Sequence, residues 1–423
     1  MDTRNRQILK IAIPSIVSNI TVPLLGIVDV SIVGHLGSAA YIGAIAVGGM
    51  MFNVIYWVFG FLRMGTSGMT SQALGRRDLG ESVSMLLRSI CVALGVALLL
   101  ILLQEPIRLA ALAIMKPSPD VAFLATSYFR ILIYGAPAML GLFSLSGWFI
   151  GMQNSRIPMA IAIIQNIVNV VASLLLVLGC GMKVEGVALG TLIAQYGGFG
   201  MGLMLCLTSY GRLRPYARLS GLWDRDVMKK FFAVNRDIFL RTLCLVAVML
   251  FFTSAGSWQG DVTLAVNTLL IQFYMIFSYI MDGFAYAGEA ISGKYYGARN
   301  AAALRSTVRL LFVWGFSMVM HSPWRMPYSA MPLCRCSPTM HPSCRLHGCI
   351  LIGFWLYRWQ EWQPLSGTEC SSVVPLHAEC SFQWLLLQPY SSLYIMPHVP
   401  LWETTDCGLP LCLICLHVGQ CKL

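Results

Sequence analysis

Residues 11–33 read IAIPSIVSNITVPLLGIVDVSIV, and their composition indicates a membrane. One α-helix of about 20 such residues crosses the hydrocarbon core of a bilayer. The only charged side chain in this run is Asp29. The stretch therefore predicts a membrane-spanning helix that carries one carboxylate inside it.

The whole chain has the same character. Of its 423 residues, 57% are apolar or aromatic and 11% are charged, and the mean hydropathy is +0.70. A soluble multidomain enzyme carries roughly twice that share of charge, so this class is disfavoured. The net charge of +11 does not indicate nucleic-acid binding, because the basic residues lie in short blocks between apolar runs. We predict an all-α polytopic membrane protein that is not an enzyme and binds no nucleic acid.

Nine apolar stretches are long enough to span a bilayer. They run approximately over 11–33, 41–73, 89–113, 122–150, 157–179, 184–209, 238–257, 262–292 and 303–320. With a cytoplasmic N-terminus, the inside segments carry eighteen Lys and Arg, and the outside loops carry only Arg108, Lys116 and Lys183. This asymmetry predicts that orientation in a bacterial inner (plasma) membrane.

A basic loop at 210–237 follows six of these spans and divides the chain. A shift of 222 residues aligns the first two spans with the seventh and eighth, and it places Gly75 on Gly297 and Arg77 on Arg299. Six spans per copy give both copies the same membrane orientation, as in transporters built from parallel halves. We expect an N-lobe at 1–210, a cytoplasmic linker at 211–237 and a partial C-lobe at 238–320.

Residues 321–423 differ sharply in composition. They hold 10 of the 14 Cys, 6 of the 7 His and 11 of the 19 Pro, without periodicity. Cys334, Cys336, Cys344 and Cys349 fit no standard zinc spacing, so we expect no metal site. We interpret the segment as the product of a frameshift near Met320, which the nucleotide sequence would test. On this interpretation the C-lobe is truncated after its third helix.

Four segments resemble one known family. They are IPSIVSNITVPLLGIVDVSIVGHLG (13–37), SQALGRRD (71–78), MKVEGVALGTLIAQ (182–195) and MDGFAYAGEAISGKYYGARN (281–300). Over residues 5–319 the chain resembles the multidrug and toxic compound extrusion (MATE) family, and within it the DinF-like branch. The resemblance implies twelve helices in two lobes around a central cavity. It also implies export of organic, often cationic compounds in exchange for protons or sodium ions, with no cofactor other than the coupling ion, by a chain that we expect to be a monomer.

Asp29 is the first candidate site residue. A carboxylate inside a membrane helix costs ~2.5–3.5 kcal/mol on the insertion scale, so the side chain either stays protonated or faces a cation. The alternatives are a structural hydrogen bond or a wet position near the outer surface. In the family that the chain resembles, an Asp on the first helix is protonated or ion-bound during transport, and bending at a preceding proline, here Pro14, is linked to its state. A static kink is the alternative for Pro14.

A polar stripe marks the fifth span, with Asn166, Asn169 and Ser173 at positions i, i+3 and i+7. The resemblance places Asn169, Ser173 and Thr191 in a small cation or proton network with the first-helix Asp. Ser173 stands where a second Asp is usual, and a hard cation prefers more anionic oxygens, so a proton is favoured over sodium. Interhelical hydrogen bonding is the structural alternative.

Asp282 and Glu289 lie seven residues apart on the eighth span and share nearly one helix face. Either could bind a second proton or attract cations. The alternatives are pairing of Asp282 with Arg63, and pairing of Glu289 with Lys294 or a position in water.

The second span also carries a set of aromatic residues. These side chains either form a wall for flat cationic compounds or serve ordinary packing. The set comprises Tyr41, Phe52, Tyr56, Trp57, Phe59 and Phe61.

The sequence contains no nucleotide-binding loop and no protease or esterase motif. We predict a secondary active efflux transporter. One alternative is a lipid-linked oligosaccharide flippase of the same superfamily, which should line its cavity with several Arg, whereas only Arg63 lies in the middle of a span. The other is a non-transporting membrane protein, because a cavity that lacks C-lobe helices is expected to be inactive.

Overall fold

The computed structural model describes residues 3–34, 38–216, 223–258 and 261–335, and within these ranges the secondary structure is helical, without strands. The interpretations of residues 336–423 therefore lie outside the described residues. The helices are α1 (Thr3–Gly34), α2 (Ala39–Val58), α3 (Phe61–Gly75), α4 (Leu79–Leu102), α5 (Gln104–Met115), α6 (Pro119–Leu132), α7 (Ala136–Gly151), α8 (Arg156–Leu174), α9 (Val184–Ser209), α10 (Arg225–Trp258), α11 (Asp261–Gly297) and α12 (Ala301–Arg335).

Six helical segments in the described residues are long and apolar enough to cross a membrane. They are Thr3–Gly34, Ala40–Gly75, Leu79–Leu102, Pro119–Gly151, Arg156–Gly179 and Val184–Ser209, and they match the first six spans expected from the sequence. Helices α10, α11 and α12 cover the other three. α12 continues to Arg335, beyond the end expected near residue 320.

Two of the expected spans have different boundaries or breaks. The third span begins at Leu79 rather than at 89, because the Asp78 side chain caps α4 by accepting a hydrogen bond from the backbone N–H of Glu81 at 2.9 Å. It ends at Leu102, and the amphipathic α5 follows as a separate helix. The span expected over 41–73 is interrupted near Gly60, between α2 and α3.

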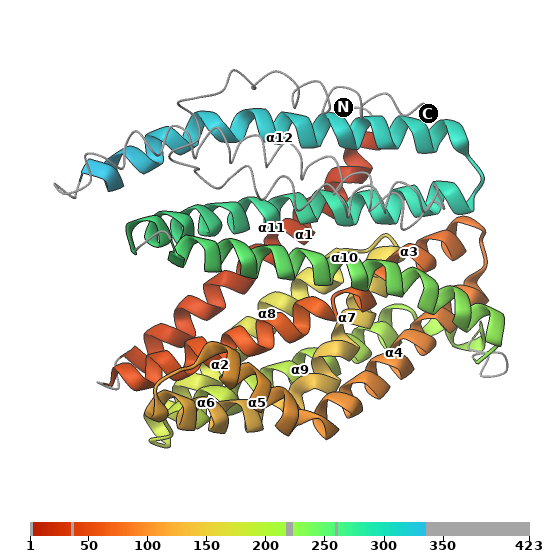
Figure 1. The fold of residues 1–423 in the computed structure, drawn as a ribbon. Coiled ribbons are helices and arrows are strands. Elements are labelled where there is room, and N and C mark those ends of the chain that lie inside the picture. Colours follow the sequence, from red (N-terminus) through yellow and green to blue (C-terminus); the bar gives the residue numbers. More distant parts are fainter. Residues whose placement is uncertain (1–2, 35–37, 217–222, 259–260, 336–423) are drawn as a thin grey trace.

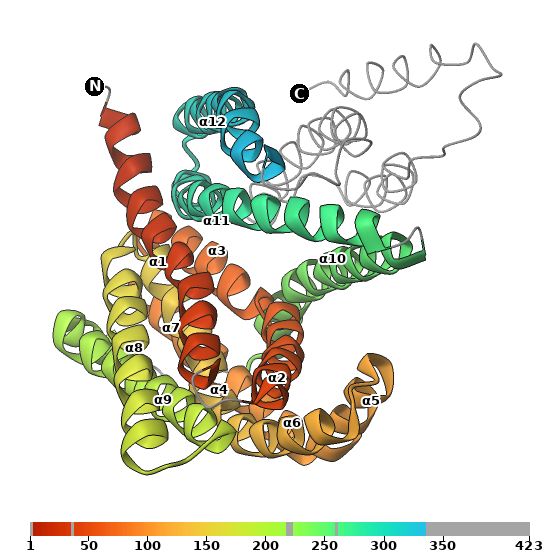
Figure 2. The same ribbon diagram turned by 90° about the vertical axis from the view of Figure 1, so that its left-hand side faces the viewer.

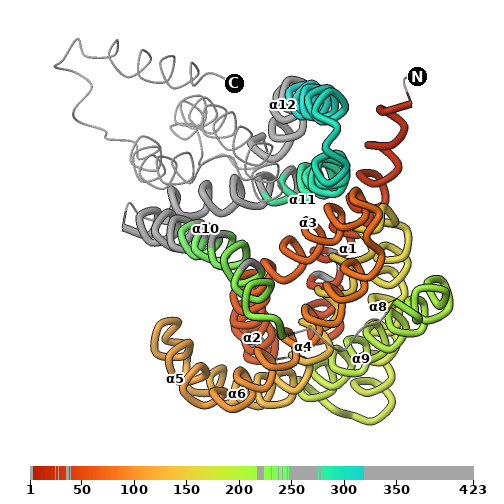
Figure 3. The backbone as a smooth tube through the Cα atoms, turned by 90° about the vertical axis from the view of Figure 1, so that its right-hand side faces the viewer, coloured from red at the N-terminus to blue at the C-terminus, as the bar shows by residue number. Residues whose placement is uncertain are grey.

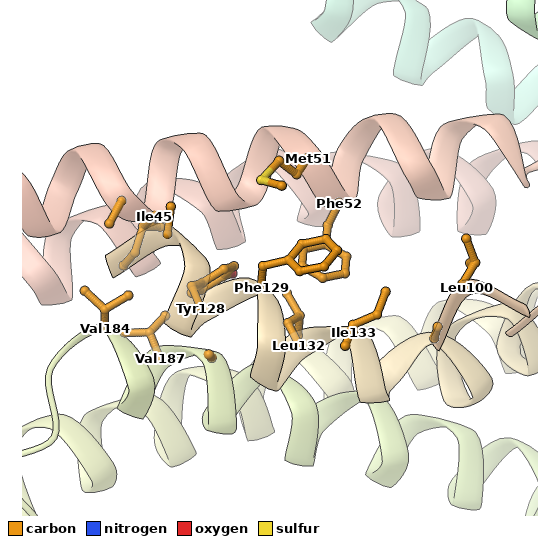
Figure 4. Close-up of a cluster of buried hydrophobic side chains, with 14 of the residues drawn as sticks. Ile45, Met51, Phe52, Leu100, Tyr128, Phe129, Leu132, Ile133, Val184 and Val187 are labelled. Carbon is orange, nitrogen blue, oxygen red and sulfur yellow. The ribbon is translucent and has the colours of Figure 1, made fainter. Parts of the chain in front are cut away.

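The helices form two groups (Figures 1 and 2). Helices α1 to α9 make one bundle, and α10 to α12 lie along one side of it. Helix α10 starts near α2 and α3 and extends away from the bundle, as the view from the opposite side shows (Figure 3). The largest hydrophobic cluster lies in the first bundle, where Phe52 of α2 stacks on Phe129 of α6 at 5.1 Å between ring centroids (Figure 4).

Helix α1 belongs to both groups. Its first half packs Ile8, Ile11 and Ala12 in a cluster with residues of α11 and α12. Its second half packs Ile32 and Val33 in the main cluster with α2, α6 and α9. A change in the environment of one half can therefore be transmitted along a single helix to the other group.

Candidate functional site

Helices α8 and α9 approach each other closely at Ser173. A Cβ atom at Gly190 would lie 2.8 Å from the backbone nitrogen of Ser173 and 2.9 Å from its Cα, so only glycine fits there. One residue further along α9, the Thr191 hydroxyl accepts a hydrogen bond from Asn169 Nδ2 at 2.9 Å and donates to the carbonyl of Val187 at 3.0 Å. The structure thus brings together the three residues of the expected network on these two helices.

Two acceptor atoms beside this hydrogen bond have no hydrogen-bond partner in the described part of the chain. They are Asn169 Oδ1 and Ser173 Oγ, in side chains that are 1% and 0% exposed. Directly after Ser173 the helix widens into a π-helical turn at Leu175–Gly179, a local geometry often found at functional sites. Unpartnered buried oxygens are costly unless a hydrogen-bond donor or a cation reaches them, so these two atoms favour a site for a small ligand.

Asp29 lies on the half of α1 that packs in the first bundle. Its side chain is 7% exposed, and Oδ1 has no hydrogen-bond partner among the described residues. Tyr128 of α6 lies within electrostatic range of Asp29 and beside the Thr191 hydroxyl. Tyr128 therefore lies near both Asp29 and the Asn169–Thr191 pair. The burial of Asp29 does not agree with the alternative of a wet position.

The sequence prediction missed Tyr128, and it missed Gln195 on α9. The Gln195 side chain is 4% exposed, its Oε1 has no partner in the described residues, and it faces the buried hydroxyl of Tyr56. Gln195 follows Thr191 by one helical turn, so the i, i+4 spacing could have identified it. Tyr128 carries no comparable signal, because one tyrosine in an aromatic-rich span is common.

Asn166 lies apart from this network. Its Nδ2 donates to the carbonyl of Thr21 on α1 at 3.3 Å. This contact is the interhelical hydrogen bonding named above as the structural alternative. It also lines an apolar cleft of about 350 Å³ between α1 and α8, together with residues such as Leu25 and Val170. The expected stripe of Asn166, Asn169 and Ser173 is therefore split between two environments.

Pro14 has a visible effect on its surroundings. Because proline has no N–H, the carbonyl of Lys10 lacks its usual donor four residues on. It accepts a hydrogen bond from the Ser155 hydroxyl at 3.3 Å instead, and Ser155 is buried at the start of α8. α1 contains a second proline, Pro23, nearer to Asp29. Both prolines lie inside one continuous helix.

Asp282 and Glu289 lie on α11, which packs on α1, α3, α10 and α12. Glu289 is fully buried, so the alternative of a side chain in water is wrong. Asp282 is half-buried and lies one turn before Tyr286, whose ring centroid is 3.6 Å from Cζ of Arg63. The mid-span arginine and the Asp282 segment of α11 are therefore neighbours.

Some residues of the aromatic set pack in the hydrophobic core. Others remain candidates for the wall of a cavity that binds flat cationic compounds. Phe52 is buried against Phe129 and Tyr128 (Figure 4). Phe61 of α3 meets Phe239 of α10 edge to face, with 5.9 Å between ring centroids. This contact joins the two helix groups, so Phe61 lies where a cavity between them would be lined.

Comparisons with known proteins agree with this architecture. The MatE family model matches residues 14–175 and 238–320. DNA damage-inducible protein F of Escherichia coli (strain K12) is 37% identical over 322 residues, which cover 74% of this chain and 67% of that protein. Protein DETOXIFICATION 44, chloroplastic, of Arabidopsis thaliana is 23% identical over 70% of this chain and 58% of its own length. A probable multidrug resistance protein NorM of Acinetobacter baylyi is 23% identical over 72% and 69%.

Solved structures have the same fold. A crystal structure of MATE in the bent conformation has a TM-score of 0.77 at 18% identity, and covers 92% of this chain and 85% of its own. A structure in the straight conformation has a TM-score of 0.74 at 19% identity, with 93% and 86% covered. This likeness shows a two-lobe helix bundle. The chain spans 58–69% of the length of the three sequence relatives above.

Proposed function

Because this chain belongs to the MATE family, in its DinF-like branch, we propose that it is a proton-coupled antiporter that exports organic, often cationic compounds across the bacterial inner membrane. The observation that carries this proposal is the buried Asp29 carboxylate, whose Oδ1 has no hydrogen-bond partner in the described residues and which lies within electrostatic range of Tyr128. A carboxylate in this place changes its charge when it binds a proton, which is what coupling requires.

The resemblance that groups Asp29 with Asn169, Ser173 and Thr191 favours a proton over sodium. Together these residues offer one carboxylate, the amide oxygen of Asn169 and the hydroxyls of Ser173 and Thr191. A sodium ion is a hard cation that needs several oxygen ligands and gains from a second negative charge. With Ser173 at the second acidic position, one proton on Asp29 neutralises the site without further ligands.

Helix α1 connects this site to the place where the N-lobe packs on α11 and α12. Its Asp29 half packs on N-lobe helices and its N-terminal half packs on α11 and α12. Protonation of Asp29 removes a charge and changes which partners the second half prefers. The first half contains Pro14, where one backbone hydrogen bond of the helix is already missing.

Competition for the same negative charge explains how export follows proton entry. A cationic compound in the cavity is attracted by ionised Asp29, and on the C-lobe side by Asp282. A proton that binds Asp29 from outside removes this attraction and releases the compound. Phe61 and Phe239 offer flat faces for an aromatic cation between the lobes.

Transport in proteoliposomes tests the proposal. The full chain is reconstituted, and efflux of ethidium is measured with a pH gradient or a sodium gradient imposed separately. We expect a proton gradient to drive transport, Asp29→Asn to abolish it, and Asp29→Glu to retain part of it. Asp226→Asn, which changes an exposed acid in the first turn of α10, serves as the matched control and should transport normally. An unchanged rate for Asp29→Asn would refute the coupling role of Asp29. Transport driven by a sodium gradient alone would refute the proton as the coupling ion.

A further inference from the structure

Helices α3 and α11 end in hairpins of the same conformation. Arg77 and Arg299, which the shift of 222 residues aligns, both have left-handed backbone, with φ of 61° and 55°. The next residues, Asp78 and Asn300, each cap the following helix by accepting a hydrogen bond from the backbone N–H three residues on, at 2.9 and 3.0 Å. The weak sequence repeat is therefore an exact match in local backbone geometry at this point of both lobes.

The two helix ends also contact each other reciprocally. A Cβ atom at Gly75 would collide with the carbonyl oxygen of Lys294 and lie 2.9 Å from the backbone nitrogen of Ala298. A Cβ atom at Gly297 would collide with the carbonyl oxygen of Gln72 and lie 2.9 Å from its carbonyl carbon. Each copy of the repeat thus presents its glycine to the backbone of the other, as in a symmetric dimer interface.

The same pair of helices is in contact further along their length. Arg63 lies over the Tyr286 ring, and these two residues differ by 223 positions, close to the repeat shift. α3 and α11 therefore run side by side from Arg63 and Tyr286 to Gly75 and Gly297. Apart from the half of α1 described above, this is the most extensive contact between α1–α9 and α10–α12 in the described residues.

We propose that Gly75 and Gly297 form a latch that holds the two lobes together at their cytoplasmic ends and opens as one unit. Backbone atoms in direct contact have no flexible side chain that can follow a movement, so a separation of about 1 Å already removes much of the attraction. Because the two contacts join the same two helix ends, a movement that breaks one also breaks the other. The link to transport rests on the proposed function, whereas the latch itself is a property of the fold.

Hydrogen–deuterium exchange of the full chain in lipid nanodiscs tests the latch directly. A Cβ atom at either glycine must push the helices apart. We expect Gly75→Ala and Gly297→Ala each to speed amide exchange about tenfold in both segments, 72–80 and 294–302, including the one that is not substituted. The double variant should add little to either single one, because both break the same contact.

Two alanine controls separate the latch from general effects. Gly95→Ala on α4 has no atom within 4 Å of the new Cβ, so it reports helix propensity alone. Gly190→Ala is crowded by the backbone of Ser173, between α8 and α9 of the N-lobe, so it should affect these two helices and leave 294–302 unchanged. If the latch variants exchange no faster than Gly95→Ala, or only in the substituted helix, the proposal is wrong.

A third variant covers the case in which a latch variant does not fold. Tyr286→Leu removes the ring under Arg63 without adding bulk, and it should speed exchange in the same two segments. No change there would also overturn the latch. These readouts do not depend on transport, so a loss of the Asp29 effect would overturn the proposed function and leave the latch standing, and the reverse also holds.

Discussion

Gly190 sets the distance between α8 and α9 at the candidate site. It allows the backbone of α9 to contact Ser173 and so places Thr191 within hydrogen-bond distance of Asn169. Neither side chain could reach the other across a wider helix pair, because both are short. The chemistry of the site therefore depends on a residue that has no polar group of its own.

Replacement of Gly190 by alanine is expected to destabilise the N-lobe. Overpacking costs ~1–3 kcal/mol, and the gain in helix propensity of at most ~1 kcal/mol does not offset it. Thermal unfolding in detergent should show a lower midpoint. Gly197→Ala and Gly200→Ala, on the same helix with nothing within 4 Å of the new Cβ, should keep or raise it. A Gly190→Ala midpoint equal to these controls would contradict the role assigned to the glycine.

The sequence could predict the candidate site only where a residue type stands out in an apolar run. Asp29, Asn169 and Thr191 are candidates because a charge, an amide or a family motif marks them, and their roles stay predictions. Tyr128 has no such mark, because tyrosine is common in membrane helices, and its position depends on how α6 packs between α2 and α9. Asn166 was grouped wrongly, because helical spacing does not say which neighbouring helix covers each side.

At the scale of elements, an ion cluster at the end of the third span joins α5 to α6. Glu105 of α5 pairs with Arg108 on its own helix at 2.6 Å and with Arg130 of α6 at 3.0 Å. Arg108 also donates to the Thr126 hydroxyl at 3.3 Å. α5 has no fully buried residue among those described, so these contacts are its main specific connection to the bundle.

This cluster predicts a local response to acid. Hydrogen bonds from Arg108 and Arg130 lower the pKa of Glu105 below its ordinary value. The stabilisation is therefore present above the unfolded pKa of about 4.3 and is lost as pH falls through the lower folded value. Amides of α5 should lose protection over that acidic range, corrected for intrinsic exchange rates. Glu105→Gln should show the loosened state already at neutral pH. Equal protection of α5 in the variant and the parent chain would contradict this account.

Element boundaries were predictable only in part. Length and hydropathy predict nine spans, because membrane helices need apolar runs of a fixed length. Six of them match membrane-long helical segments in the described residues, and the other three fall on α10, α11 and α12. Length and hydropathy did not reveal the break near Gly60 or the early start of α4, since a break inside an apolar run leaves composition unchanged and a cap depends on one side chain.

At the scale of the whole molecule, two lobes were expected from a shift of 222 residues with few identities. The structure adds that α1 packs in both groups, and that the equivalent helix ends meet at Gly75 and Gly297. The repeat alone could not predict these contacts. Aligned residues show which positions are equivalent, but not which ones touch.

Membrane orientation can be tested with lysines that the chain already has. A cytoplasmic N-terminus places Lys116 and Lys183 outside, and Lys10, Lys229 and Lys294 inside. A membrane-impermeant amine reagent on intact cells, followed by peptide mass spectrometry, should label the first two, and broken cells should label all five. A hydrogen bond with Tyr41 raises the pKa of Lys183, so less of its reactive neutral amine is present at a given pH. Lys183 should therefore label more slowly than Lys116 at neutral pH and approach it as pH rises. Labelling of Lys229 in intact cells, with Lys116 protected, would reverse the orientation and would place the glycine latch on the outer face.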